Sequence, residues 1–139
     1  MKKLFLLVVL LVVCTTGLFA QSKNTSMLIL PFKNQTQEEN ISGSENIGSI
    51  LFRSLYTFIG IIPSLDVPDE EVLTNIDYQL TNIEELAKQE GSDLIVYGSF
   101  EQSGEVGSEM ITIDLKVWSG KGDAILYEKE YSAEKGLGL

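Results

Sequence analysis

The 139-residue sequence contains no histidine, one cysteine and only three prolines. Histidine is the side chain that most often serves as a general base near neutral pH and as a metal ligand. Its absence excludes serine–histidine and cysteine–histidine catalytic arrangements. A single cysteine, Cys14, rules out an intramolecular disulfide and a site of several thiolates. No glycine-rich phosphate-binding motif occurs either, because Gly120-Lys121-Gly122 falls in an expected hairpin turn rather than between a strand and a helix.

Positive charge is also scarce, with 10 Lys and Arg against 20 Asp and Glu and a net charge of −10. Such a surface repels phosphate backbones and anionic headgroups, which disfavours nucleic-acid binding. The acids are dispersed, so a solvated surface is the first interpretation and a basic partner the second. Asp69-Glu70-Glu71 is better explained by the preference of a helix N-terminus for negative charge than by a metal site. Paired carboxylates of a hydrolase remain a third hypothesis.

The N-terminal residues have the layout of an export signal. Lys2 and Lys3 precede the apolar run Leu4–Val13, and Ala20 precedes a polar stretch. A membrane span needs roughly 20 apolar residues, more than this segment offers. We therefore expect a signal peptide over residues 1–20, cleaved after Ala20. Lipidation of Cys14 is the alternative, although Val13 stands where a lipoprotein signal usually has Gly, Ala or Ser; otherwise Cys14 is one more apolar residue of the signal.

Residues 21–139 are expected to form a single α/β domain with its core over about 27–131. Apolar residues at steps of three and four predict a helix over 47–59, with a Ser42–Glu45 capping box and a left-handed Gly60 at its end. A short helix is expected over 69–73. A second capping box, Thr81–Glu84, predicts a helix that carries Ile83, Leu86 and Ala87 and ends at Gly91.

Strands are predicted over 27–32, 61–67, 94–100, 110–118 and 124–131, with a loop over 33–43. Pro63 argues for an edge position of the second strand, and the apolar run 94–100 for a central one. The order is β-α-β-α-β-β-β, which predicts a mixed sheet with helices mainly on one face. Gly98 should mark a close backbone approach. The predicted core residues are Leu28, Leu30, Ile50, Leu55, Phe58, Val96, Ile113 and Leu115.

Several segments in this order resemble the amino-terminal domain of TolB and related periplasmic domains of the FlgO and CsgG type. They are the strand and loop 28–34 (LILPFKN), the helix 47–59, the segments 83–87 and 91–100, and the hairpin 110–131. The resemblance implies a fold like that of the anticodon-binding domain and a non-catalytic role in envelope protein assemblies. TolB continues into a β-propeller and CsgG carries pore-forming strands, and this sequence contains neither. The resemblance therefore implies either the isolated domain or a truncated form of a longer protein.

These observations lead to one main functional hypothesis and one alternative. The main hypothesis is an exported, non-catalytic envelope protein without a cofactor, located in the periplasm or attached to a membrane through a lipid, in a diderm bacterium. It would bind another envelope protein or a further copy of itself, and no nucleic acid. The alternative is a periplasmic small-ligand-binding domain. Tyr97, Trp118 and Tyr127 are the candidate partner contacts, because aromatic side chains combine large area with a polar group; partial burial on the sheet explains them equally well.

Overall fold

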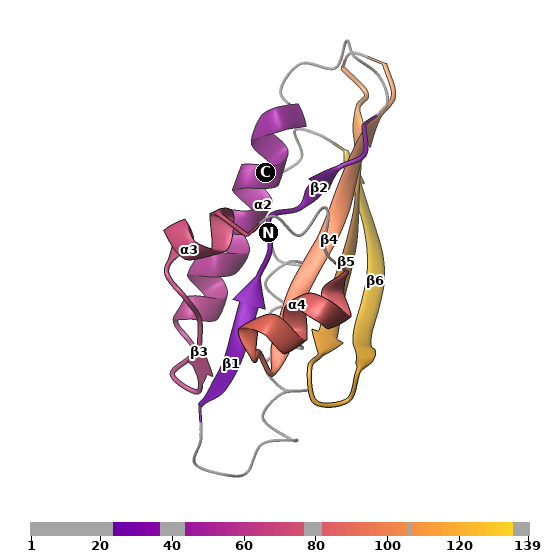
Figure 1. The fold of residues 1–139 in the computed structure, drawn as a ribbon. Coiled ribbons are helices and arrows are strands. Elements are labelled where there is room, and N and C mark those ends of the chain that lie inside the picture. Colours follow the sequence, from indigo (N-terminus) through magenta and orange to yellow (C-terminus); the bar gives the residue numbers. More distant parts are fainter. Residues whose placement is uncertain (1–23, 37–43, 77–81, 106, 135–139) are drawn as a thin grey trace.

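The computed structural model describes residues 24–36, 44–76, 82–105 and 107–134, with the side chains of 44–46 left undescribed. The expected signal peptide and Cys14 lie outside these residues. Three helices and six strands follow in chain order (Figure 1), and they confirm the predicted α+β class. The elements are β1 (Thr25–Ile29), β2 (Lys33–Asn34), α2 (Ser44–Gly60), β3 (Leu65–Asp66), α3 (Glu70–Thr74), α4 (Ile83–Glu90), β4 (Leu94–Ser103), β5 (Met110–Ser119) and β6 (Ala124–Glu134).

The strands form one mixed sheet in the order β3-β1-β4-β5-β6. β1 pairs in parallel with β3 and β4, whereas β4, β5 and β6 form an antiparallel meander. β2 also pairs with β4, further along the same side as β1. The strand expected over 27–32 is therefore interrupted at Leu30-Pro31-Phe32 and resumes inside the expected loop. Pro31 lacks the backbone N–H that a continuous ladder would use.

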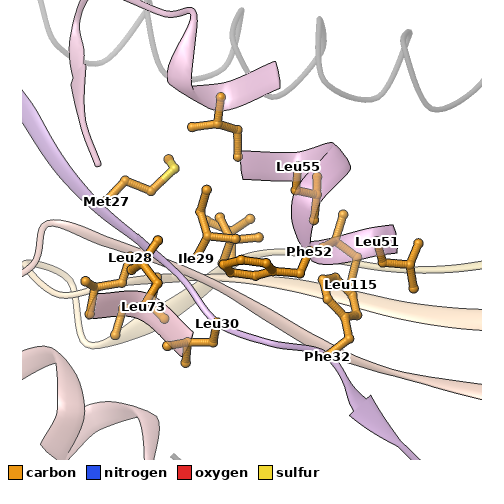
Figure 2. Close-up of a cluster of buried hydrophobic side chains, with 14 of the residues drawn as sticks. Met27, Leu28, Ile29, Leu30, Phe32, Leu51, Phe52, Leu55, Leu73 and Leu115 are labelled. Atoms are coloured by element: carbon orange, nitrogen blue, oxygen red, sulfur yellow. The ribbon is translucent and has the colours of Figure 1, made fainter. Parts of the chain in front are cut away.

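The hydrophobic core lies between the sheet and α2. Ile47, Leu51, Leu55 and Ile59 recur along one side of α2 and are buried, as are the residues of β4 and β5 that face them. Figure 2 shows Leu51, Phe52 and Leu55 of α2 and Leu73 of α3 gathered around β1. The run from Met27 to Leu30 is buried on both of its faces, because helices flank β1 as well as strands.

Most of the predicted core is confirmed. Leu28, Leu30, Leu55, Val96 and Leu115 are buried, and Phe58 and Ile113 are partly buried against the same cluster. Ile50 is the exception, since half of its side chain is exposed (50%). At 3.6 residues per turn, Ile50 falls on the far side of the stripe that Leu51 and Leu55 define. The prediction that it belongs to the core was wrong.

The helix ends differ from the expectation in two places. The N-cap of α4 is Asn82, whose side chain accepts a 2.8 Å hydrogen bond from the Glu85 amide, so the cap lies one residue after the predicted box at Thr81. Gly91 does end α4 in the left-handed conformation, with φ of 62°. Gly60 also ends α2, but its φ angle is not positive, so the left-handed conformation predicted for it was wrong. Ser42 lies outside the described residues.

The remaining strand predictions hold with changed lengths. β3 contains only two residues of the expected 61–67 strand and occupies the sheet edge beside β1, as Pro63 indicated. Gly98 does mark a close approach, because a Cβ atom there would lie 2.0 Å from the Asp114 carbonyl oxygen and 2.8 Å from the Phe32 ring. None of the helices in the described ranges has the length and hydrophobicity needed to cross a membrane.

Candidate functional site

The sheet has one closed face and one partly open face. Side chains alternate along β4 and β5, and those on the α2 side are mostly buried, whereas those on the other side are mostly half-buried, with exceptions that include the buried Ile95 and the exposed Glu101. Directly paired residues of neighbouring strands share a face. The register therefore gathers a set of side chains that we call the open face: Tyr97, Ser99, Asp114, Lys116, Trp118, Glu128 and Glu130.

Lys116 is the centre of the charge network on the open face. Its ammonium group lies 3.1 Å from Asp114 Oδ2 and 2.9 Å from Glu128 Oε1. Hydrogen bonds to Glu128 and Asp114 raise the pKa of Lys116 to about 12, so the ammonium stays charged at any physiological pH. Glu130 pairs with Asp114 across β5 and β6, which places two like charges side by side. Two carboxylates thus contact the ammonium group and a third, Glu130, lies opposite Asp114 in the strand register, so the open face is acidic toward β6.

A surface cleft of about 360 Å³ lies where the open face meets α4 and the end of β2. Its lining includes Tyr97 and Lys116 of the sheet and Asn82 at the start of α4. Burial raises the pKa of the Tyr97 phenol above its ordinary value of 10.0, so the hydroxyl remains protonated and able to donate a hydrogen bond. The full lining consists of Lys33, Gln35, Asn82, Ile83, Tyr97, Gly98, Ser99, Asp114 and Lys116.

A second cleft, of about 420 Å³, opens between α2, α3 and β2. The Arg53 guanidinium lies 3.2 Å from Glu70 Oε1 at its border. Glu70 and Glu71 occupy the first turn of α3, as the helix-terminus interpretation of this acidic run predicts. Among the described residues no three His, Cys, Asp or Glu side chains come together as a metal-binding group.

The structure brings two of the three predicted contact residues to the same face. Tyr97 pairs with Lys116, and Trp118 pairs with the neighbouring Ile95, so both belong to the open face. Tyr127 is paired with Val117 on the α2 side, and its hydroxyl lies 2.5 Å from that of Tyr131. The Trp118 indole nitrogen is buried and has no hydrogen-bond partner within the described chain. Partner contact by these residues stays a prediction.

Asp93 joins three segments and was missed as a key residue. The Ser26 amide and hydroxyl donate hydrogen bonds to Asp93 Oδ2 at 3.0 and 3.1 Å, and the Asp93 amide donates to Ser26 Oγ at 2.9 Å. Lys121 forms an ion pair with Asp93 Oδ1 at 2.9 Å, and the Gly120 amide donates to the Asp93 carbonyl oxygen. Partial burial alone would raise the pKa of Asp93, but the bonds from Lys121 and Ser26 outweigh it and lower that pKa below 3.8.

One signal in the sequence could have revealed Asp93. Asp93 lies between Gly91, which ends a helix, and an uninterrupted apolar strand. Burial of an unpaired carboxylate at the start of such a strand costs free energy, so Asp93 is expected to have hydrogen-bond or ion-pair partners. The hairpin expected at Gly120-Lys121-Gly122 is present, and its lysine supplies one of those partners. Asp93 therefore fixes the starts of β1 and β4 relative to the β5–β6 turn.

Comparison with known proteins identifies the fold. No protein-family model and no curated protein sequence matches the chain. Among solved structures, the lipoprotein GNA1162 from Neisseria meningitidis has a TM-score of 0.55 at 18% identity, covering 83% of this chain and 84% of that one. TolB from Acinetobacter baumannii has a TM-score of 0.54 at 11% identity, with 84% of this chain and 25% of TolB covered. LpoB from Escherichia coli gives 0.53 at 12% identity, with 84% and 60% covered.

These similarities confirm the resemblance at the level of the fold. The chain has a TolB- and LpoB-like domain fold, shared with proteins of low sequence identity. Identities of this size carry no residue-level correspondence, so the open face of this chain has to be judged on its own side chains.

Proposed function

We propose that this chain is an exported, non-catalytic protein of the bacterial envelope that acts as a protein–protein interaction or assembly module. The observation that carries the proposal is the open face, a half-exposed sheet surface with two aromatic side chains and a fixed charge network beside an exposed edge strand. The fold shared with a lipoprotein and with TolB and LpoB supports an envelope location. The sequence adds an export-like leader and has no histidine.

The charge network favours recognition of a partner surface. Lys116 is held between two carboxylates, so its side chain is ordered before any partner arrives and loses little conformational freedom on binding. Tyr97 offers a ring and a protonated hydroxyl beside it. Aromatic residues of this kind are enriched among the few side chains that dominate binding energy in protein interfaces.

The experiment that tests the proposal is site-specific photo-crosslinking in cells. A photoreactive residue replaces Ser99 on the open face, and a matched one replaces Gln89 on the exposed side of α4. A single envelope protein that cross-links in stoichiometric amounts at Ser99 and not at Gln89 supports the proposal. Cross-links between copies of this chain would indicate a homo-oligomer instead of a separate partner. If neither position gives a cross-link, the interaction hypothesis is wrong.

A specific observation favours a second candidate function, the binding of a small polar ligand. The 360 Å³ cleft combines the Tyr97 ring with Lys116, Asn82 and Asp114, which together offer stacking, donor and acceptor groups. Ligand screening by NMR would reveal such a role through shifts confined to the cleft lining. Those shifts should disappear in Tyr97→Ala and persist in Tyr56→Ala, an aromatic truncation on α2.

A further inference from the structure

Among the described residues, the outer edge of β6 is the longest strand edge without a pairing partner. β6 runs over 11 residues at the end of the sheet order, and within the described residues only β5 pairs with it (Figure 1, yellow). All of its side chains are exposed except Tyr127 and Tyr131, which are half-buried. The opposite edge of the sheet, β3, offers only two residues. An exposed edge strand presents backbone donors and acceptors to any extended segment that approaches it.

Self-pairing of this edge is opposed by its own charges. In an antiparallel pair of two β6 strands related by a twofold axis, the central residue faces itself. If the twofold axis passes beside Glu128 or Glu130, that carboxylate lies directly opposite its own copy. If the axis passes beside Lys129, the two Lys129 ammonium groups lie opposite each other, and Glu128 of each strand lies opposite Glu130 of the other. Like charges directly opposite destabilise a strand pair. The edge is therefore unsuited to pairing with a second copy about its middle.

The same charges define the partner that does fit. Glu128 and Glu130 alternate on the open face beside Asp114, with Lys116 as the compensating cation there. Lys129 lies on the opposite face, with its ammonium 5.0 Å from the centre of the Tyr131 ring. At the start of the strand, Ile125 and Leu126 are 44% and 54% exposed. An added strand would meet carboxylates on one face, aromatic rings on the other and an apolar anchor at one end.

We infer that the edge of β6 receives an extended, basic segment of the partner protein as an additional β-strand. Lys or Arg at alternate positions of that segment face Glu128 and Glu130, and β-branched residues at the positions between them lie over Tyr127 and Tyr131. Main-chain hydrogen bonds supply the affinity in this mode of recognition, and the alternating side chains supply the specificity. The inference rests on the proposed function and names the chemistry of its partner.

Fluorescence anisotropy tests this inference with the purified mature chain and a labelled peptide in which Lys alternates with Val. Binding is expected, and it should be lost when Glu replaces Lys in the peptide. Two further peptides carry N-methylated amides at alternate positions, in the two possible registers. One of them should bind about tenfold more weakly, because its methyl groups remove the donors that a strand ladder needs. If all Lys peptides bind equally, charge attraction alone explains the binding, and the inference of an added strand is overturned.

The protein side of the test uses a charge-matched pair of double variants. Glu130→Lys with Glu134→Lys, both on β6, should weaken binding of the Lys peptide at least about fivefold, since it replaces attraction by repulsion. Glu90→Lys with Glu105→Lys makes the same change of net charge at exposed positions of α4 and of the β4–β5 turn. The inference requires the control to bind as the unchanged protein does; a matching loss would contradict it.

The outcomes separate this inference from the function on which it rests. A photoreactive residue at Ser132 of β6 that cross-links the protein captured at Ser99 supports both. Capture at Ser99 without any binding of the peptide leaves the interaction module intact and overturns strand addition at β6. Cross-links between two β6 strands would also overturn it, in favour of self-pairing. If neither cross-linking nor peptide binding is observed, both the proposed interaction function and this inference are contradicted.

Discussion

At the scale of single residues, Asp93 shows how one carboxylate can order several segments. It accepts hydrogen bonds from Ser26, which is 67 positions away in the sequence, and it forms an ion pair with Lys121. We expect Asp93→Asn to lower the free energy of unfolding by about 1–2 kcal/mol, because it removes a charge-assisted acceptor at a partly buried site. Urea denaturation measures the loss. Glu105→Gln, the same change of group in an exposed turn, should leave the midpoint unchanged.

The acid sensitivity of the fold should depend on the same residue. The pKa of Asp93 is lower in the folded chain than its ordinary value of 3.8. Its contribution to stability is therefore fully present above about pH 4 and is lost as the pH falls through the folded pKa. The difference in urea midpoint between the unchanged protein and Asp93→Asn should shrink from pH 6 to pH 3. A difference that stays constant over this range would contradict the assignment.

Gly98 gives a second residue-scale prediction. A methyl group there would lie 2.0 Å from the Asp114 carbonyl oxygen, and neither β4 nor β5 can move without breaking their shared ladder. We expect Gly98→Ala to destabilise the protein by about 3 kcal/mol, at the upper end of overpacking costs. Gly60→Ala is the control, because nothing lies within 4 Å of the added atom and the residue is helical. A neutral Gly98→Ala would mean that the strands separate more easily than their register implies.

At the scale of elements, the sequence predicted which segments form helices and strands better than where they begin. The periodic stripe identified α2, and the alternation of β5 separated buried from half-buried positions. The start of α4 was missed by one residue because Thr81-x-x-Glu84 and Asn82-x-x-Glu85 both satisfy the capping pattern. Only the fold decides between two caps of equal local chemistry.

The open face was only partly predictable for a related reason. Tyr97 and Trp118 were assigned from residue type, but the face to which Tyr127 belongs depends on the pairing of β6 with β5. A register shift between Val117 and Trp118 intervenes there, so that Tyr127 follows Val117 to the α2 side. A bulge of this kind reverses the expected alternation and leaves no clear mark in the sequence. The Lys116 network was missed because Glu128 joins it only through that register.

The observed cap of α4 makes its own prediction. The Asn82 side chain satisfies the Glu85 amide, one of the free N–H groups at the helix start. Asn82→Ala should cost about 1 kcal/mol of stability, the usual effect of losing an N-cap. Thermal unfolding measures the loss, and Gln89→Ala, at an exposed position later in α4, should change the melting temperature little. Equal effects of the two changes would show that the cap contributes nothing special.

At the scale of the whole molecule, export and maturation follow from the proposed function. Cleavage after Ala20 predicts a mature chain that begins at Gln21 and stays soluble in the envelope fraction. Lipidation predicts a chain that begins at a modified Cys14 and sediments with membranes. Intact-mass measurement of the purified protein distinguishes the two. We expect the mass of the Gln21 form, unchanged in Cys14→Ala; a mass increased by acyl chains, lost in Cys14→Ala, would establish the lipoprotein form instead.

The position of β1 within the sheet has a consequence for how such a chain reaches its destination. β1 is the first strand of the described residues, yet both of its neighbours come later in the sequence, β3 at 65–66 and β4 at 94–96. The buried residues Met27–Ile29, which pair with Leu94–Val96, therefore have no paired residue on a neighbouring strand until β4 has been made. For a chain that is exported, as we propose, this late pairing would delay closure of the core and favour the extended form that a narrow secretion channel admits.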